Sequence, residues 1–375
     1  MRKKFFLIAS FPDSLLNFRG PFLLALLAEG LEVHVAAPGL PANSQVRQKL
    51  ENLGVQVHNI MLNRTGFNPL VDLATIYHLW SLMRRLKPDY FLGYTIKPIV
   101  YGGIAAWLTR IPSRHSLITG LGYFFIKSHD RSSILKQVVH VLYKISLAKS
   151  HKIFFQNPDD EELFFSLRIL KKSDAKTVVI NGSGINIENF DVALFPTSLR
   201  FLMIARLLGD KGVREYVAAA KIVRKQYPTI KFGLVGSIDD NPDAISGPEL
   251  EEMQKAGDVD FYGYLKDVKD AIAESSVYVL PSYREGTPRS VLEAMAMGRP
   301  IITTDVPGCR ETVINGENGF LVSVKSVEQL VSAMMRFIDS PGLIETMGKR
   351  SRQIVVEKYD VHKVNAIMLT EMGIA

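Results

Sequence analysis

The chain has 375 residues, of which 47% are hydrophobic and 22% charged, a balance that excludes a disordered or collagen-like chain and predicts two or three domains. Its single cysteine excludes an internal disulfide and a thiolate-cluster metal site. No uncharged apolar run approaches the ~20 residues needed to span a bilayer. We therefore expect a soluble, cytoplasmic chain, and we interpret the apolar residues near the amino terminus as a buried strand rather than a signal peptide.

The net charge of +7 is unevenly distributed. Residues 1–180 contain 23 Lys and Arg against 12 Asp and Glu, a net charge of +11, whereas residues 181–375 carry a net charge of −4. Such an excess suggests a surface for phosphates, anionic lipid or nucleic acid. Segments 79–87 and 127–152 mix basic and apolar residues at helical spacing. Each is either a helix lying on an anionic membrane or a core-facing helix with a basic rim.

Short apolar runs alternate with helical patterns along the first half, which is typical of βαβ units around a parallel sheet. The predicted strands are Lys4–Ala9, Glu32–Ala37, Tyr90–Gly93, His115–Ile118, Lys152–Gln156 and Val178–Ile180. The predicted helices are Gly20–Glu29, Asn43–Asn52, Val71–Leu86 and Gly102–Thr109.

A second βαβ series follows a seam of clustered Gly and Asn at residues 181–190. Its predicted strands are Arg200–Ala205, Lys231–Val235, Val259–Tyr262, Val277–Pro281, Pro300–Thr304 and Gly319–Val322. Its predicted helices are Lys211–Gln226, Lys266–Glu274, Pro288–Met297 and Val327–Ser340. We predict two doubly wound domains, residues 1–185 and 186–355, and a final helix within 356–375 that packs back on the first domain. In such sheets ligands bind at the carboxyl ends of the strands.

The segment 277–300 carries the most chemical information. A buried strand, a polar loop and a helix follow one another, with Thr287 as the predicted N-cap and Pro288 as the first helical residue. The free N–H groups of residues 287–290 and the helix dipole form a site suited to a diphosphate. Glu285 and Glu293 flank it and suit the hydroxyls of a sugar and a ribose, unless they are merely a solvated loop acid and a surface helix acid.

Two other strand ends support the interpretation that this loop binds a nucleotide-linked sugar. Arg206 follows a predicted strand and Lys211 opens the next helix, so two cations stand where a departing diphosphate needs neutralising. Gly236 ends another strand and allows a close approach of a ligand to the backbone.

These elements, together with segments 261–267 and 315–322, resemble glycosyltransferase family 4, whose members are retaining enzymes with the GT-B fold of two Rossmann-like α/β domains facing a central cleft. The resemblance implies a UDP-sugar donor and no metal or other cofactor. It implies that Arg206 and Lys211 contact the diphosphate, Glu285 the donor sugar and Glu293 the ribose. Residues 262–265 would cover the base. The implied donor-binding set is Arg206, Lys211, Gly236, Tyr262, Tyr264, Leu265, Glu285, Gly286, Thr287, Pro288 and Glu293, of which Glu285, Arg206 and Lys211 are also catalytic.

Segments 94–106 and 117–123 resemble bacterial enzymes that extend sugars on undecaprenyl diphosphate, N-acetylgalactosaminyltransferases above all. This implies a polyprenyl-diphosphate-linked acceptor, peripheral binding to the inner face of the cytoplasmic membrane and a role in O-antigen, capsule or lipid-linked oligosaccharide synthesis. The implied acceptor-binding residues are Arg19, Gly20, Lys97, Thr119 and Gly120. The use of another UDP-hexose as the donor stays open, because the choice between epimeric sugars depends on only one or two hydrogen bonds.

Some features point elsewhere. The family's histidine near the donor sugar has no counterpart in the loop 119–122, so we assign no histidine a role. The acidic pair Asp258 and Asp260 matches a metal signature but precedes a strand, so we interpret it as a turn. A nucleotide-sugar epimerase would also have two facing α/β domains, and the basic isoelectric point of 9.2 would suit a nucleic-acid-binding protein. The acidic second half argues against the latter.

Overall fold

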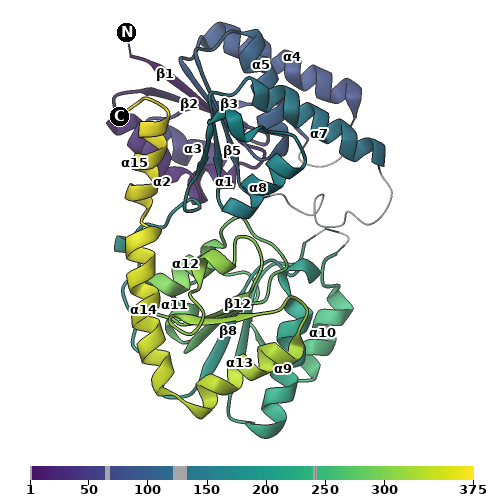
Figure 1. The fold of residues 1–375 in the computed structure, drawn as a ribbon, viewed down its shortest axis with the longest axis vertical. Helices are drawn as coiled ribbons and strands as arrows, with labels where there is room; N and C mark the ends of the chain where they lie inside the picture. The colour runs from purple at the N-terminus through teal and green to yellow at the C-terminus, as the bar shows by residue number, and fades with distance from the viewer. Residues whose placement is uncertain (1, 64–67, 121–132, 240, 242) are drawn as a thin grey trace. The chain divides into compact units, whose positions relative to one another are not determined.

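The structure is a computed structural model that describes residues 2–63, 68–120, 133–239, 241 and 243–375 (Figure 1). The chain forms two compact units. Unit 1 combines Met1–Ser183 with Val361–Ala375, and unit 2 is Gly184–Asp360. The chain therefore leaves unit 1 once and returns to it for its last residues.

Unit 1 is built on a seven-stranded parallel sheet with the order β3-β2-β1-β4-β5-β6-β7. Its strands are β1 (Lys4–Ile8), β2 (Glu32–Ala37), β3 (Gln56–Asn59), β4 (Tyr90–Tyr94), β5 (Ser113–Ile118), β6 (Lys152–Phe155) and β7 (Thr177–Val179). Its helices are α1 (Asp13–Asn17), α2 (Gly20–Ala28), α3 (Gln45–Asn52), α4 (Pro69–Leu86), α5 (Gly103–Leu108), α7 (Ser133–Ala148), α8 (Pro158–Ser166) and α15 (Val361–Glu371), with a π-helical turn η1 (Pro98–Gly102) before α5.

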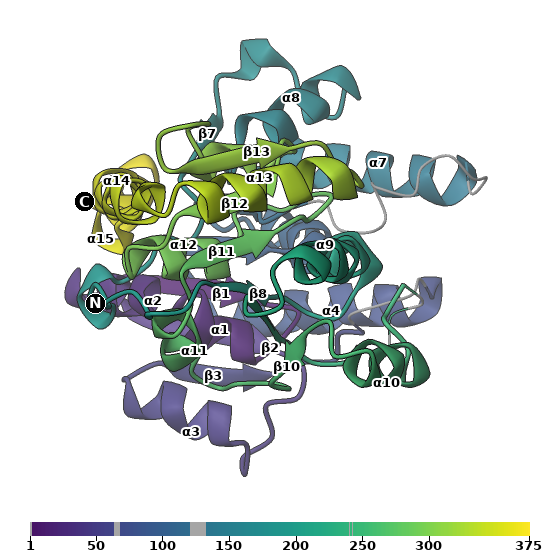
Figure 2. The ribbon, with the colours of Figure 1, turned by 90° about the horizontal axis from the view of Figure 1, so that it is seen from below.

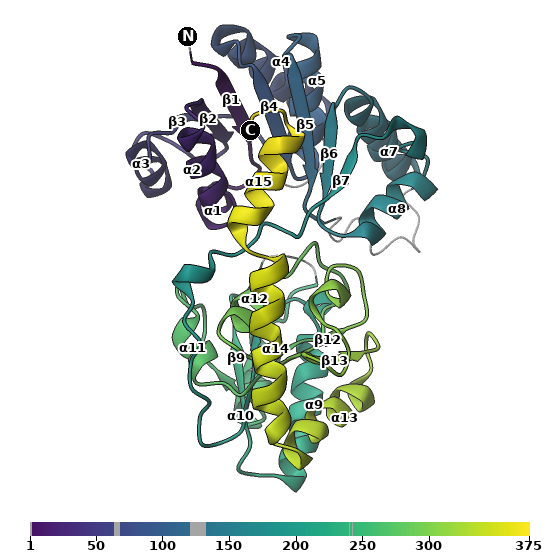
Figure 3. The same cartoon turned by 60° about the vertical axis from the view of Figure 1, so that its left-hand side comes forward.

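Both faces of this sheet are covered, and the period-2 alternation of strand side chains divides the core. Phe5 and Leu7 of β1 pack into a cluster with side chains of α2, α3 and α15, whereas Phe6 and Ile8 pack with α4, α5, α7 and α8 on the other face. Figure 3 shows α2 and α15 beside the strands of this unit. The first strand lies in the middle of the sheet, and a strand buried on both faces needs a continuous apolar run.

Unit 2 has a six-stranded parallel sheet with the order β10-β9-β8-β11-β12-β13. Its strands are β8 (Arg200–Ile204), β9 (Lys231–Val235), β10 (Asp260–Phe261), β11 (Val277–Leu280), β12 (Ile301–Thr304) and β13 (Gly319–Val322). Its helices are α9 (Val213–Gln226), α10 (Gly247–Lys255), α11 (Lys269–Ala273), α12 (Arg289–Ala296), α13 (Val327–Asp339) and α14 (Gly342–Lys358). Unit 2 also has the short 3₁₀ turns η3 (Ile187–Asn189), η4 (Gly209–Lys211) and η5 (Arg310–Thr312), and unit 1 has the 3₁₀ turn η2 (Lys172–Asp174). Helices α9 and α13 cover one face of the sheet, and α12 packs with α14 on the other (Figure 2).

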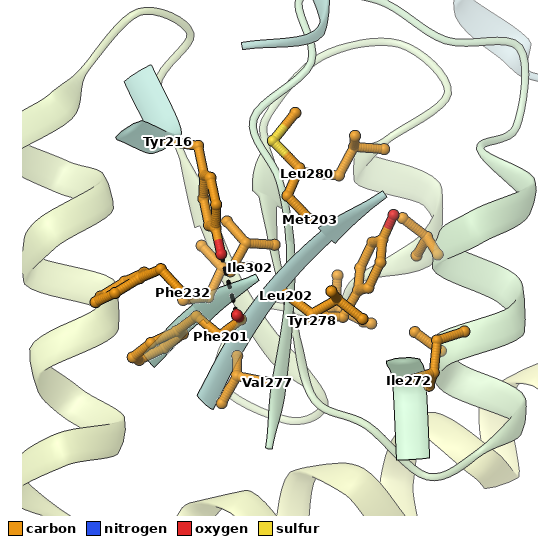
Figure 4. Packing of buried hydrophobic residues seen from close by; sticks show 14 of the residues in the cluster. Phe201, Leu202, Met203, Tyr216, Phe232, Ile272, Val277, Tyr278, Leu280 and Ile302 are labelled. Carbon is orange, nitrogen blue, oxygen red and sulfur yellow. Dashed lines mark hydrogen bonds between the residues drawn. The ribbon is translucent and has the colours of Figure 1, made fainter. Parts of the chain in front are cut away.

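The core of unit 2 is mainly apolar, and the hydroxyls of the buried tyrosines Tyr216 and Tyr278 have hydrogen-bond partners. The rings of Phe201 and Phe232 stack with their centroids 5.2 Å apart. The Tyr216 hydroxyl donates a hydrogen bond of 3.1 Å to the Phe201 carbonyl (Figure 4). Tyr278 is fully buried, and its hydroxyl lies 2.9 Å from the Ile204 carbonyl. These bonds tie α9 and β11 to strand β8.

The predicted elements are largely present, with some differences. The short helix α1 was not predicted. Strand β3 was not predicted, because it is an edge strand with one apolar residue, Val57, among four. The strand predicted at Val259–Tyr262 shortens to two residues. Helices α10 and α14 were not predicted, although the Ser246 side chain accepts a hydrogen bond from the Glu249 amide, a recognisable helix start. Helix α12 begins at Arg289 rather than Pro288, which moves the N-cap from Thr287 to Pro288, a residue with no side-chain cap.

Acid is expected to destabilise unit 1 through His115 of β5. Burial first, then the charges of His151, Lys152 and Arg114, lowers the pKa of His115 to about 3. Because the unfolded state binds the proton at its ordinary pKa near 6.5, the stability present above pH 6.5 is lost as the pH falls towards 3. At pH 5 the loss is about 2 kcal/mol.

We expect the melting temperature to drop between pH 7 and pH 5, and to drop less in His115→Gln. Calorimetry at both pH values measures this. An equal drop in the wild type and the variant would contradict the assignment.

Candidate active site

The candidate site lies at the carboxyl ends of the unit 2 strands, in the loop between β11 and α12. Two glycines let neighbouring loops approach this loop more closely than a side chain would permit. A Cβ on Gly212, which has a φ of +76°, would lie 2.2 Å from the Pro281 carbonyl oxygen. A Cβ on Gly308, with a φ of +83°, would lie 2.2 Å from the Glu285 carbonyl oxygen. The loops after β8 and β12 therefore clamp the loop that carries Glu285.

Lys211 and Glu285 form the central ion pair. The Lys211 Nζ atom donates to Glu285 Oε1 at 2.7 Å, and both side chains are less than one-fifth exposed. Burial alone would lower the pKa of Lys211, but the attraction of Glu285 and its hydrogen bond outweigh burial and raise it. The lysine is therefore a fixed positive charge. The structure thus brings together two predicted catalytic residues that are far apart in sequence.

Arg206 has a carboxylate partner that the sequence did not reveal. Its Nη1 atom lies 2.9 Å from Asp239 Oδ2, and the arginine side chain is half exposed. Its charge acts on both Asp210 and Lys211, which places the third predicted catalytic residue near the ion pair. The pKa of Asp210 is raised, and burial is the main cause. The Oδ1 atom of Asp210 is buried with no hydrogen-bond partner in the described part of the chain.

Helix α12 is tied to the end of β8 by two hydroxyls. Tyr278 and Ser290 bond each other at 2.7 Å, and both reach the Ile204 carbonyl. Further along the helix, Glu293 accepts from Arg289 Nε at 2.9 Å. Burial raises the pKa of Glu293, and Arg289 opposes the shift. Burial above all raises the pKa of Tyr278, and the charges of Glu293 and Glu285 add to this shift.

The remaining predicted donor residues occupy the same edge of the sheet. The Gly236 amide donates to the Gly263 carbonyl at 2.9 Å, which joins the end of β9 to the turn 262–265. In that turn Tyr264 is exposed, and the Tyr262 hydroxyl accepts from Arg200 at 3.2 Å. Gly286 and Pro288 are buried, while Leu265 and Thr287 are half-buried.

The predicted acceptor residues lie in unit 1. Arg19 and Gly20 begin α2 and are both buried. Thr119 and Gly120 follow β5 at its carboxyl end. Lys97 is buried, and its Nζ atom lies 3.1 Å from Asp72 Oδ1 on α4. The ammonium of Lys97 is thus neutralised inside unit 1.

Several contributing residues escaped prediction. Asp239 pairs with Arg206, and the charge of Asp210 acts on Lys211. Tyr278 and Ser290 tie helix α12 to the end of β8. Only Ser290 carried a signal, as a hydroxyl in the first turn of a helix. Within the described ranges no cluster of three or more His, Cys, Asp and Glu side chains could hold a metal ion. None of the helices in those ranges is both long and apolar enough to cross a bilayer.

Two α/β units, each built on a parallel sheet, are the architecture of the GT-B class, and solved structures agree. A sucrose-phosphate synthase from Thermosynechococcus elongatus matches with a TM-score of 0.79 at 20% identity, over 98% of both chains. The Anabaena protein Alr3699/HepE in complex with UDP-glucose matches with a TM-score of 0.74 at 18% identity, over 99% of both chains. The predicted GT-B fold is confirmed.

Sequence relatives give the family. The family model described as "Glycosyl transferases group 1" matches residues 198–340, and "Glycosyl transferase 4-like" matches residues 8–157. An N,N'-diacetylbacillosaminyl-diphospho-undecaprenol alpha-1,3-N-acetylgalactosaminyltransferase from Campylobacter jejuni is 31% identical over 361 residues, 92% of each chain. A UDP-Gal:alpha-D-GlcNAc-diphosphoundecaprenol alpha-1,3-galactosyltransferase from Escherichia coli is 25% identical over 78% of this chain and 77% of its own. The chain belongs to glycosyltransferase family 4 and is a glycosyltransferase.

Proposed function

We propose that the protein transfers an N-acetylhexosamine, N-acetylgalactosamine in the first instance, from a UDP-sugar to a sugar linked to polyprenyl diphosphate, with retention of configuration. The observation that carries the proposal is the Lys211–Glu285 ion pair, clamped beside the start of α12. The Campylobacter jejuni relative supports the transferred sugar and the acceptor, because its name gives both. Such a reaction would serve the synthesis of a bacterial O-antigen, capsule or lipid-linked oligosaccharide.

The chemistry follows from the charges at the strand ends. A departing UDP carries developing negative charge, which Lys211 and Arg206 would neutralise together with the N–H groups at the start of α12. Glu285 would accept hydrogen bonds from the donor sugar, and Glu293 from the ribose. An oxygen of the leaving diphosphate would take the proton of the acceptor hydroxyl on the same face, so the reaction would need neither a protein base nor a metal ion.

A panel of UDP-sugars with a short-chain polyprenyl-diphosphate sugar tests the proposal. We expect mass spectrometry to find one added N-acetylhexosamine with UDP-N-acetylgalactosamine, and NMR to find a retained anomeric configuration. Preferred use of UDP-galactose would favour the second candidate, a galactosyltransferase, for which the Escherichia coli relative speaks. Conversion of the donor in the absence of acceptor would contradict a transferase.

We also propose that unit 1 rests on the anionic inner face of the cytoplasmic membrane. Exposed apolar side chains form i, i+3, i+7 stripes on two helices of its basic half: Leu70, Leu73 and Tyr77 on α4, and Val138, Val141 and Ile145 on α7. Basic residues accompany both helices, with Arg84 over the Trp80 ring at 4.9 Å and Lys149 over the Trp107 ring at 4.9 Å. Apolar stripes with a cationic rim suit an anionic lipid surface.

Replacing Leu70 and Leu73 together by glutamate is expected to weaken vesicle binding at least tenfold, since two apolar contacts are lost and two negative charges face anionic lipid. Co-sedimentation with vesicles containing phosphatidylglycerol measures the effect. Leu194→Glu serves as the control, because that side chain is almost fully exposed in unit 2. Equal binding of the double variant and the control would contradict the proposed surface.

A further inference from the structure

Both cations that we assign to the donor diphosphate already have a carboxylate partner within unit 2. Lys211 is paired with Glu285, which is itself assigned to the donor sugar. Arg206 is paired with Asp239, whose Oδ2 atom lies 2.9 Å from Arg206 Nη1. The proposed transfer reaction gives Asp239 no task. Asp239 thus neutralises a cation that the reaction needs for the diphosphate.

The backbone of unit 2 fixes Asp239 in its place opposite the arginine. The loop after β9, which carries Asp239, is bonded to the loop after β8 on both sides of this residue. The Leu207 amide donates to the Ser237 carbonyl at 3.0 Å, and the Ile245 amide donates to the Leu207 carbonyl at 2.8 Å. Asp239 Oδ1 accepts from the Asn241 amide at 3.0 Å, which directs Oδ2 to the arginine. The contact is therefore built into the fold of the two loops.

The Arg206–Asp239 pair is accessible to a competing anion. The side chain of Arg206 is 49% exposed and that of Asp239 is 27% exposed. Such partly exposed ion pairs are weak, because water screens both charges. A diphosphate carries more negative charge than one carboxylate, and it offers the planar guanidinium two oxygens at once. A diphosphate is therefore able to displace Asp239 from Arg206.

We propose that Asp239 competes with the diphosphate of UDP for Arg206, and that its return to Arg206 after sugar transfer speeds the release of UDP. This rests on the proposed function, because it takes the diphosphate to be a ligand of Arg206. The charges give a reason for the exchange. Arg206 opposes the protonation of its neighbour Lys211, so a bare pair of cations would repel each other when no nucleotide is bound. Product release limits the turnover of many enzymes, and an internal counter-ion lowers the affinity for the product.

A second arginine–carboxylate pair in unit 2 provides a matched control. Arg214 of α9 donates to Glu249 of α10 through Nε at 2.6 Å and through Nη2 at 2.9 Å. These side chains are 46% and 29% exposed, nearly the same as those of Arg206 and Asp239. Neither Arg214 nor Glu249 is assigned to the donor. Removing the charge of Glu249 therefore changes the surface of unit 2 in a comparable way and leaves the contact at Arg206 intact.

The test is calorimetric titration of the full chain with UDP. We expect Asp239→Asn to bind UDP about three- to fivefold more tightly than the wild type, because the diphosphate no longer displaces a charged partner. Glu249→Gln is expected to keep the wild-type affinity. In the Arg206→Gln background, the further change Asp239→Asn is expected to have no effect on UDP affinity.

The variant is expected to fold, because an asparagine side chain also accepts from the Asn241 amide. Asp239→Ser is the second variant, since a serine hydroxyl accepts the same bond. In transfer assays we expect the inhibition constant of UDP to fall by the same factor as its dissociation constant in both variants, with a kcat no higher than that of the wild type. A purely structural role of Asp239 would not tighten the binding of a product.

Unchanged or weaker UDP binding in Asp239→Asn and Asp239→Ser would overturn the proposal, because Asp239 would then orient Arg206 rather than compete for it. An equal gain in Glu249→Gln, or a gain that persists in the Arg206→Gln background, would also overturn it, since the effect would then come from net charge alone. A chain that binds UDP in the expected pattern but transfers no sugar would refute the proposed function and leave the competition at Arg206 standing.

Discussion

Lys211→Ala is expected to lower sugar transfer by at least the ~10²-fold that follows the loss of one preorganised electrostatic group. The ammonium is nearly buried and lies 2.7 Å from Glu285, so its charge acts where little water screens it. In the proposed mechanism its removal would deprive the leaving diphosphate of a cation and would leave the Glu285 carboxylate without its partner. We expect the loss mainly in kcat, because the charge on the diphosphate grows in the transition state.

Steady-state kinetics with UDP-N-acetylgalactosamine measures this effect. Lys211→Arg keeps the charge and should retain more activity than Lys211→Ala. Lys255→Ala is a matched control, because Lys255 is an exposed lysine of the same unit paired with Glu251 on the surface. Near-wild-type turnover in Lys211→Ala would remove the central element of the proposed mechanism.

The second large effect is expected for Glu285→Gln. Transfer should fall by about 10²-fold, the usual consequence of losing one charged group at a reacting centre, while UDP affinity changes little, because the carboxylate is assigned to the sugar. In the variant, the effect of burial on the pKa of Lys211 is no longer offset by the charge of Glu285. Without the attraction of Glu285 its pKa falls, so the residual activity should decline at a lower pH than in the wild type as the pH rises.

A pH profile of kcat and calorimetric titration with UDP measure both parts of this prediction. Glu317→Gln is the control, since Glu317 forms an exposed ion pair with Arg350 in the same unit. Equal losses of UDP binding and transfer would place Glu285 against the nucleotide rather than the sugar, contrary to the assignment.

The sequence predicted the sheets well because parallel strands buried on both faces are continuous apolar runs. Strands β2, β9 and β13 match their predicted bounds. The edge strand β3 escaped because it has few apolar residues, and the start of α12 shifted by one residue because proline accommodates both positions. Strand ends are set by hydrogen bonds with neighbours that a local pattern does not contain.

At the candidate site, Lys211 and Glu285 could be predicted because both follow apolar runs, and ligands bind at the carboxyl ends of parallel strands. Their mutual bond was not predictable, since it depends on loops clamped at Gly212 and Gly308. Asp239 escaped because it lies in a polar loop without periodicity.

The return of the chain to unit 1 has a consequence for biosynthesis. Helix α15 contributes Val364, Met368 and Leu369 to the core around β1, and Glu371 pairs with Lys152 of β6 at 2.6 Å. A ribosome delivers these residues after unit 2, which is already complete when Asp360 emerges. Residues 2–183 must therefore wait with an uncovered apolar face until residues 361–375 arrive, and nascent chains stalled before that point are expected to be sensitive to proteases and dependent on chaperones.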